Sequence, residues 1–192
     1  TSNEANNILL HLQTLRPNIY YSNDAKLLKD NSGFKNLVDK VAPKESSAQR
    51  TIKSYKGQVF IAFSKNPKAS GDLYGAYIAP SLKNDLSVET WRRGAGGPLT
   101  SNCSSTYKII NVDTLEMKFK GGNIFTTDEW LYTQDHAKWA VTTASISPFV
   151  CIADINRMES QFKRGGGSLC FNDSDVWKQF NDIIKGVEAC PK

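Results

Sequence analysis

The residues best suited to chemistry lie in one short segment, Asp135-His136-Ala137-Lys138-Trp139. Side chains two positions apart on a strand point to the same face, so His136 and Lys138 would project into one space. An imidazole can attack phosphorus or transfer a proton, and a neighbouring ammonium group can bind a phosphate oxygen. Asp135, or a carboxylate on a neighbouring strand, could orient the imidazole through its second nitrogen. The pattern is consistent with phosphoryl chemistry, although a histidine beside a lysine is more often an ordinary surface feature.

A second group of polar residues follows the strand expected at 148–153. Residues 154–157, Asp-Ile-Asn-Arg, would bring a carboxylate, an amide and a guanidinium to one end of a sheet. The loop expected next contains three glycines at 165–167, which suit a close approach to a ligand, a positive φ in a tight turn, or a flexible loop tip. Cys151 and Cys170 flank this segment, and a disulfide between them would contribute about 3 kcal/mol on chain-entropy grounds.

Several side chains also have simpler interpretations. Arg157 and Arg164 fit solvated charges or structural ion pairs as well as they fit phosphate contacts. Trp91, followed by two arginines, suggests base stacking beside a phosphate contact. More often such a trio is a strand end with a buried tryptophan and two exposed arginines. His11 would lie on a helix among leucines, where a partly buried structural role is favoured over catalysis.

The composition limits the kinds of site that the chain can build. Its 192 residues include four cysteines, none in a C-x₂-C pair, and two histidines, so neither a compact zinc site nor a His-rich two-metal centre is expected. We expect no metal or organic cofactor. The net charge is +5, but residues 1–68 hold 11 Lys/Arg against 5 Asp/Glu, whereas residues 69–192 hold 13 against 14. A nucleic-acid footprint would need the amino-terminal cations to fold toward His136, or a second polypeptide to supply others.

The compartment can also be inferred. No apolar run approaches the roughly 20 residues that cross a bilayer, so we expect a soluble protein. The chain begins at Thr1 without a leader pattern, which suggests a processed protein or a fragment. The even cysteine count and the glycosylation sequons at Asn102 and Asn172 favour an oxidising environment, secreted or lysosomal.

The elements that would position these residues form one domain over 1–192, because no repeat or linker divides the chain. Apolar spacing predicts a helix over 3–15, ended by Pro17. Further helices are expected over 26–41 with a turn at 31–33, over 73–82 and over 173–187. Strands are expected at 18–22, 57–63, 86–91, 107–112, 138–141 and 148–153. Strands interleaved with helices predict an α/β or α+β fold, a mixed β-sheet flanked by helices.

Taken together, these segments resemble the C-terminal half of the deoxyribonuclease II family. The resemblance covers about 20 to 190 and rests mainly on the D-H-x-K-W block at 135–139 and the R-G-G-G-x-L-C block at 164–170, in that order. Other matching segments are F-S-K at 63–65, D-L-Y at 72–74, S-N-C-S at 101–104, D-I-N-R at 154–157, W-K at 177–178 and the closing Cys190.

The resemblance implies one half of a phospholipase-D-like pseudo-dimeric fold, in which each half contributes one H-x-K motif to a shared site. It implies a secreted or lysosomal acid endonuclease that hydrolyses DNA phosphodiesters without metal and leaves 3′-phosphate ends. His136 would be either the nucleophile or the acid that protonates the leaving oxygen. The resemblance also implies Lys138 as phosphate ligand and Asn156 as a further contact. To these we add, from residue type and position, Arg157 and Arg164 as candidate substrate contacts and Asp135 and Asp154 as candidate orienting carboxylates. The implied disulfides are Cys103–Cys190 and Cys151–Cys170.

The sequence also departs from the family pattern. His11 is followed by Leu12-Gln13, so it is no second H-x-K, and Ala140 stands where many animal relatives have cysteine. A single H-x-K has no acid to complement its nucleophile, so we expect the isolated chain to be inactive without an N-terminal half or a homodimer partner. The alternatives are an inactive secreted member that binds nucleic acid or a host protein, and a phosphodiesterase for another substrate.

Overall fold

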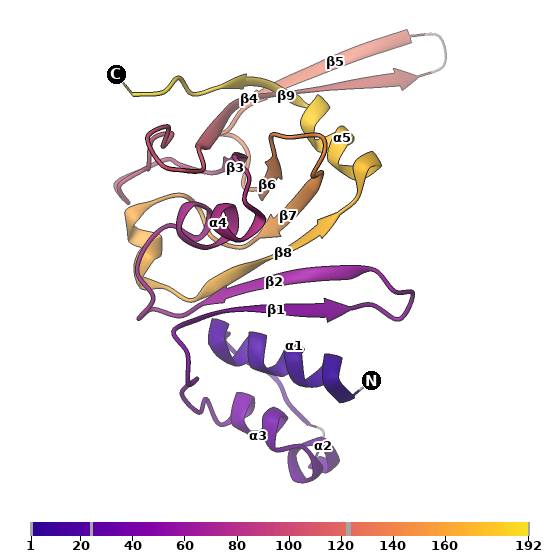
Figure 1. Cartoon of the computed structure of the whole chain (residues 1–192), viewed down its shortest axis with the longest axis vertical. Helices are drawn as coiled ribbons and strands as arrows, with labels where there is room; N and C mark the ends of the chain where they lie inside the picture. Colours follow the sequence, from indigo (N-terminus) through magenta and orange to yellow (C-terminus); the bar gives the residue numbers. More distant parts are fainter. Residues whose placement is uncertain (1, 24, 122–123, 192) are drawn as a thin grey trace.

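A computed structural model of the chain describes residues 2–23, 25–121 and 124–191 (Figure 1). The helical elements are α1 (Ser2–Leu15), α2 (Ala25–Asp30), α3 (Ser32–Val38), the π-helical turn η1 (Leu73–Ile78), α4 (Ala79–Leu82), the 3₁₀ turn η2 (Glu159–Lys163) and α5 (Ser174–Asp182). The strands are β1 (Ser47–Lys53), β2 (Val59–Lys65), β3 (Leu86–Thr90), β4 (Ile109–Gly121), β5 (Ile124–Leu131), β6 (Lys138–Thr142), β7 (Phe149–Ala153), β8 (Gly166–Asn172) and β9 (Ile184–Val187).

Within the described residues, nine strands form one sheet in the order β1-β2-β8-β7-β6-β3-β4-β5, and β9 pairs with β4. The β3–β4 pair is parallel and the other pairs are antiparallel. Helices lie against this sheet, which confirms the predicted mixed sheet flanked by helices. None of the helices in these three ranges is both long and apolar enough to cross a membrane.

The amino-terminal helices form as the sequence predicts. Helix α1 places apolar side chains along one stripe and packs on β1, β2 and α3. The predicted break near residue 31 is present, because the Asn31 side chain accepts a hydrogen bond from the Phe34 N–H at 2.9 Å and caps α3.

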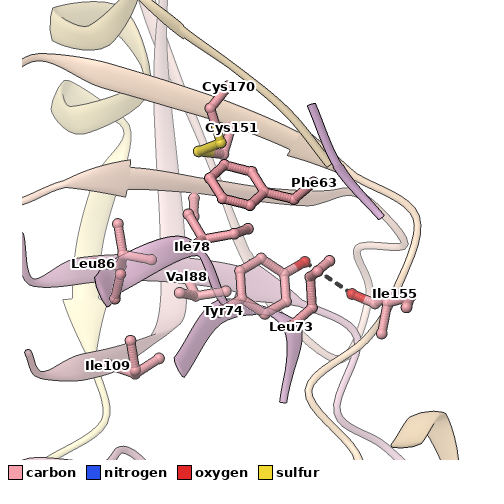
Figure 2. Close-up of a cluster of buried hydrophobic side chains, with 12 residues drawn as sticks. Phe63, Leu73, Tyr74, Ile78, Leu86, Val88, Ile109, Cys151, Ile155 and Cys170 are labelled. Carbon is pink, nitrogen blue, oxygen red and sulfur yellow. Dashed lines mark hydrogen bonds between the residues drawn. A yellow bond between two sulfur atoms is a disulfide. The ribbon is translucent and has the colours of Figure 1, made fainter. Parts of the chain in front are cut away.

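One face of the sheet packs against the η1–α4 segment and forms the main core (Figure 2). Phe63, Tyr74 and Leu86 are almost completely buried there, beside the disulfide between Cys151 and Cys170. The Tyr74 hydroxyl donates a hydrogen bond to the carbonyl of Ile155 at 2.8 Å. This bond holds the chain where it leaves β7, which is the beginning of the predicted polar segment.

The opposite face is covered by α5. Trp139 packs edge-on against Phe180 with ring centroids 5.1 Å apart, and the indole N–H of Trp177 donates to the carbonyl of Thr142 at 2.7 Å. Helix α5 begins at the predicted cap, where the Asp173 side chain accepts bonds from two backbone N–H groups.

Several predicted elements differ from the structure. Residues 18–22 do not form a strand, β4 continues far beyond 112, and β1 and β5 were not predicted. The helix predicted over 173–187 ends at Asp182, because the chain then pairs with β4 as β9. The predicted glycine loop is instead the start of β8, a central strand between β2 and β7.

The three consecutive glycines bring segments of the protein close together. None of them has a positive φ. A Cβ at Gly167 would lie 2.0 Å from the Phe63 carbonyl oxygen, and one at Gly165 would lie 2.0 Å from the Leu15 carbonyl oxygen. The close approach is therefore to backbone of the same chain, and the interpretations as a tight positive-φ turn or a flexible loop tip are wrong.

Gly165→Ala should therefore destabilise the protein by about 2 kcal/mol, because the added methyl group would push α1 away from β8. The free energy of unfolding measured in urea tests this. Gly186→Ala is the matched control, since its Cβ would meet the Thr114 side chain at 3.3 Å and no closer atom. Equal losses of stability in the two variants would contradict the close contact with α1.

Candidate functional site

The predicted site residues gather at one end of the sheet. In the strand register, Lys138 at the start of β6 pairs with Thr90 at the end of β3. Ala153 at the end of β7 pairs with Ser168 near the start of β8. The H-x-K segment, residues 154–157 and the glycine segment therefore leave the sheet at the same end, as the sequence predicts for 154–157.

His136 lies exposed in the loop that precedes β6. Its ring stacks on the indole of Trp91, with centroids 4.8 Å apart and planes inclined by 24°. The Trp91 N–H donates to the carbonyl of Thr133 at 3.2 Å, which fixes the indole. The Lys138 ammonium group donates to the carbonyl of His136 at 2.7 Å. His136 therefore precedes the strand on which the sequence placed it beside Lys138, and the contact between the two residues is from the Lys138 ammonium group to the His136 backbone carbonyl.

Asp135 holds the loop that carries the imidazole. One carboxylate oxygen accepts from the N–H of Ala137 at 2.8 Å, and the other accepts from the indole N–H of Trp130 at 3.1 Å. An aspartate readily binds the backbone N–H two residues onward, which competes with a bond to a neighbouring ring. The two hydrogen bonds of Asp135 therefore go to the loop backbone and to Trp130, whereas the sequence suggested that Asp135, or a carboxylate on a neighbouring strand, could bind the imidazole.

Asp154 links the end of β7 to β8. The residue is largely exposed, but its Oδ1 accepts the N–H of Gly167 at 2.7 Å. Desolvation of this sheltered end raises the pKa of Asp154, whereas the Gly167 N–H and the charges of Arg164 and Lys138 lower it. Lys138 and Arg164 are thus close enough to this carboxylate to interact with it electrostatically.

Asn156 follows on the same segment and is half-buried. Its Oδ1 is buried and has no hydrogen-bond partner among the residues that the structure describes. Leaving a buried amide oxygen unpaired costs about 1–3 kcal/mol. A buried amide oxygen without a partner needs an explanation, and Asn156 lies at the same end of the sheet as His136. Asn156 is therefore a residue to test for function.

Arg157 and Arg164 have different surroundings. The Arg157 side chain is buried, and its Nε donates to the Asp72 carboxylate at 3.0 Å while Nη1 donates to Asn111. Of the three interpretations given above, these contacts favour the structural ion pair for Arg157. Arg164 is exposed, and its Nη1 donates a hydrogen bond to the side-chain oxygen of Gln161 at 3.2 Å, which leaves other N–H groups of the guanidinium to bind a ligand.

Lys65 is a structural residue whose role the sequence did not indicate, although it lies in the matching F-S-K block. It is completely buried, and its ammonium group donates to the carbonyls of Gln161, Phe162 and Arg164 at 3.2, 3.1 and 2.9 Å. Burial lowers its pKa, and the neighbouring Arg164 charge acts in the same direction. Lys65 thereby fixes the turn from which Arg164 projects.

Glu89 is a second buried residue that the sequence did not indicate. It lies on β3, has no exposed surface, and neither carboxylate oxygen has a hydrogen-bond partner in the described part of the chain. Its cross-strand neighbour is the buried Trp139. Burial raises the pKa of Glu89 to about 8; Arg92 opposes this, and Asp135 and Asp113 add to it. An alternating strand pattern alone does not distinguish such a buried carboxyl from an exposed one.

The segment after Trp91 corrects the expectation of two exposed arginines. Arg92 is buried, forms an ion pair with Asp113 at 2.8 Å, and lies 4.1 Å from the ring centroid of Tyr132. Arg93 is exposed. Trp91 itself is half-buried beneath His136, so it is neither a free base-stacking platform nor a fully buried core residue.

The structure contains two disulfides, one of which joins the strands β7 and β8. Cys151 and Cys170 face each other across β7 and β8, and Cys103 bonds Cys190 near the C-terminus. These are the pairs that the resemblance implies. The sequon residues Asn102 and Asn172 are exposed. No group of three or more potential metal ligands occurs in the described ranges.

His11 lies away from this end-of-sheet cluster, on α1, which packs on β1 and β2. Its side chain is buried, and Nδ1 has no hydrogen-bond partner among the described residues. Burial lowers its pKa to about 4, and the Arg50 charge contributes. These surroundings favour the structural role.

Comparison with known proteins adds to this geometry. The family model described as Deoxyribonuclease II matches residues 1–190. The chain is 39% identical to Deoxyribonuclease-2 of Caenorhabditis elegans over 171 residues, which cover 88% of the chain and 43% of that relative. It is 34% identical to Cell-death-related nuclease 7 of the same organism over 161 residues (82% and 42%). It is 39% identical to Plancitoxin-1 of Acanthaster planci over 142 residues (74% and 37%).

The chain spans less than half the length of each of these relatives. The family match nevertheless covers nearly all of its own residues, including the H-x-K segment and the R-G-G-G block. The chain therefore belongs to the deoxyribonuclease II family.

Proposed function

We propose that this chain is the C-terminal half of an acid endonuclease that hydrolyses DNA phosphodiesters through His136. The observation that carries the proposal is the exposed imidazole of His136, which stacks on Trp91, while the Lys138 ammonium group binds the backbone carbonyl of the same histidine. Membership of the deoxyribonuclease II family supports DNA as the substrate. The disulfides and exposed sequons favour a secreted or lysosomal protein.

The proposed reaction needs two imidazoles. One nitrogen attacks phosphorus and forms an N–P bond as the P–O5′ bond breaks, and a second imidazole protonates the leaving 5′ oxygen. Water then hydrolyses the N–P bond and leaves a 3′-phosphate. His136 supplies one of the two imidazoles, and Lys138 binds a non-bridging oxygen and offsets its charge. Asn156 and Arg164 are further proposed contacts, and Asp135 and Asp154 hold the loops that present them.

A second half must supply the other imidazole. The chain has one H-x-K motif, and its other histidine, His11, is buried on α1. We therefore propose that activity requires an N-terminal half of the same protein or a second copy of the chain. Acid pH suits this arrangement, because one imidazole must be protonated while the other is neutral.

A plasmid-nicking assay with EDTA at about pH 5 tests the proposal. We expect the protein with its second half bound to nick DNA and His136→Asn to lower the rate about 100-fold, the smaller end of the range for a lost acid–base group. His11→Asn is the matched control and should keep the activity. Mass measurement under non-denaturing conditions shows whether a second polypeptide is present. Equal rates in the two variants would overturn the role of His136.

The single H-x-K motif also favours one alternative, an inactive secreted family member that binds nucleic acid or a host protein. Salt-dependent DNA binding without cleavage, in a sample shown by mass to contain two halves, would support that alternative.

A further inference from the structure

A hollow of about 460 Å³ lies beside the proposed site, between the end of α1 and the start of β8. We propose that this hollow binds a second phosphate group of a polynucleotide, a few nucleotides from the one that reaches His136 and Lys138. The inference rests on the proposed function and adds a substrate-positioning role for Arg16. The residues that line the hollow include Arg16, Asn18, Pro67, Asp154, Arg164 and Gly166.

The position of the hollow suits a polynucleotide whose backbone runs from the hollow to His136 and Lys138. Gly166 starts β8 and Lys138 starts β6, and β7 lies between these two strands. Two strand spacings and an offset of two residues along the strands place them about 12 Å apart. Phosphates follow one another every 3.4 Å along the axis of each strand of a duplex, so about three to four nucleotide steps cover that distance.

Both arginines are held on fixed backbone. Gly165 packs directly on the carbonyl of Leu15, the last residue of α1, so the helix end cannot move independently of β8. Arg16 follows with a φ of 54°, and its N–H donates to the Leu12 carbonyl at 3.1 Å. The buried ammonium group of Lys65 holds the carbonyl of Arg164. Figure 1 shows the end of α1 beside the beginning of β8.

The charge of the hollow favours an anion. The side chains of Arg16 and Arg164 are exposed, and neither takes part in an ion pair within the described ranges. Asp154 is the acidic residue among those that line the hollow, and its Oδ1 is already bound to Gly167. Two guanidinium groups thus share the hollow with one carboxylate, which leaves one positive charge in excess, and guanidinium groups bind phosphate oxygens in bidentate geometry.

The hollow brings a basic residue of the amino-terminal third close to the proposed site. The amino-terminal third carries the basic excess, and α1 brings at least one of its cations to the end of the sheet that holds the H-x-K segment. Arg16 therefore adds a third positive charge to those of Lys138 and Arg164 at this end of the sheet.

The test is the affinity of the intact chain, as His136→Asn so that the probe is not cut, for a long single-stranded oligodeoxynucleotide. Arg16→Gln and Arg164→Gln should each weaken binding about threefold to tenfold and lower the slope of log K against log salt by about 0.7. Arg16→Lys should retain the slope. A dinucleotide, too short to span both places, should bind equally with and without Arg16→Gln.

Lys56→Gln is the matched control, because Lys56 is exposed in the β1–β2 turn at the opposite end of the sheet. If the oligonucleotide binds but Arg16→Gln behaves like Lys56→Gln, the hollow is no phosphate site and the proposed function survives. If no variant with an intact hollow binds the oligonucleotide, the inference fails together with the proposed function.

Discussion

Glu89→Gln should stabilise the protein at alkaline pH by up to about 5 kcal/mol relative to its effect at acid pH. The pKa of Glu89 rises from 4.5 to about 8, mainly because the carboxyl is completely buried. The folded state therefore holds a proton that the unfolded state releases between those two values. A difference of this size corresponds to about 5 kcal/mol of folding free energy.

The extra proton on the folded state determines how the free energy of unfolding changes with pH. Below pH 4.5 the carboxyl is neutral in both states, and folding carries no charge penalty. As the pH rises toward 8, the unfolded chain gains the free energy of ionisation that the folded chain cannot, so the stability of the unmodified protein falls. A glutamine at position 89 has the same shape and no charge, and it removes that dependence.

Urea unfolding of both proteins between pH 4.5 and 8.5 measures the effect. The stability difference between Glu89→Gln and the unmodified protein should grow steadily toward alkaline pH. Glu159→Gln is the matched control, because Glu159 is exposed. Parallel pH profiles for Glu89→Gln and the unmodified protein would show that Glu89 ionises freely in the folded state.

The location of Glu89 gives the prediction its functional interest. It precedes Trp91 by two positions on the β3 side of the site, and its strand neighbour, Thr90, pairs with Lys138. Asp135, which holds the His136 loop, is among the charges that act on it. Ionisation at this position would place an unpaired charge in the β3–β6 strand pair, whereas the raised pKa of Glu89 keeps its carboxyl neutral at the acid pH of the proposed reaction.

The parts of the fold that sequence predicts well are those with a local cause. The apolar stripe of α1 and the break near residue 31 are local features, and both are present, although the predicted turn at 31–33 is shorter and α3 begins at Ser32 behind the Asn31 cap. Strand β8 was assigned to a loop because glycines disfavour strands. Its pairing with β2 and β7 outweighs that preference, and the glycines are required because Phe63 and Leu15 approach too closely for a side chain. A contact between residues so distant in the chain leaves no local pattern.

In the candidate site, too, local features are predicted from the sequence and contacts between distant segments are not. The sequence predicts His136 and Lys138 on one strand face, but β6 begins at Lys138 and the contact is to the backbone carbonyl of His136. The Trp91 ring under His136 and the Arg16 side chain beside Arg164 depend on how separate segments pack. Arg157 illustrates the limit, because its burial against Asp72 decides among the three roles that its residue type leaves open.

His11→Leu should make the protein less sensitive to acid, with the opposite sign to Glu89→Gln. Burial lowers the pKa of His11 from 6.5 to about 4, so the unfolded state takes up a proton in this range that the folded state refuses. The unmodified protein therefore loses stability as the pH falls from 6.5 to 4, by about 3 kcal/mol once the pH is below 4.

Thermal or urea unfolding at several values between pH 7 and 4 measures this loss. The His11→Leu variant should lose about 3 kcal/mol less than the unmodified protein across this range, and the leucine also removes the unpaired Nδ1. His136→Leu is the control, because His136 is exposed. Equal acid sensitivity of His11→Leu and the unmodified protein would mean that His11 is protonated in the folded state. Glu89 and His11 therefore lower stability at opposite ends of the pH range: Glu89 at alkaline pH, where the unfolded chain ionises, and His11 at acid pH, where the unfolded chain takes up a proton.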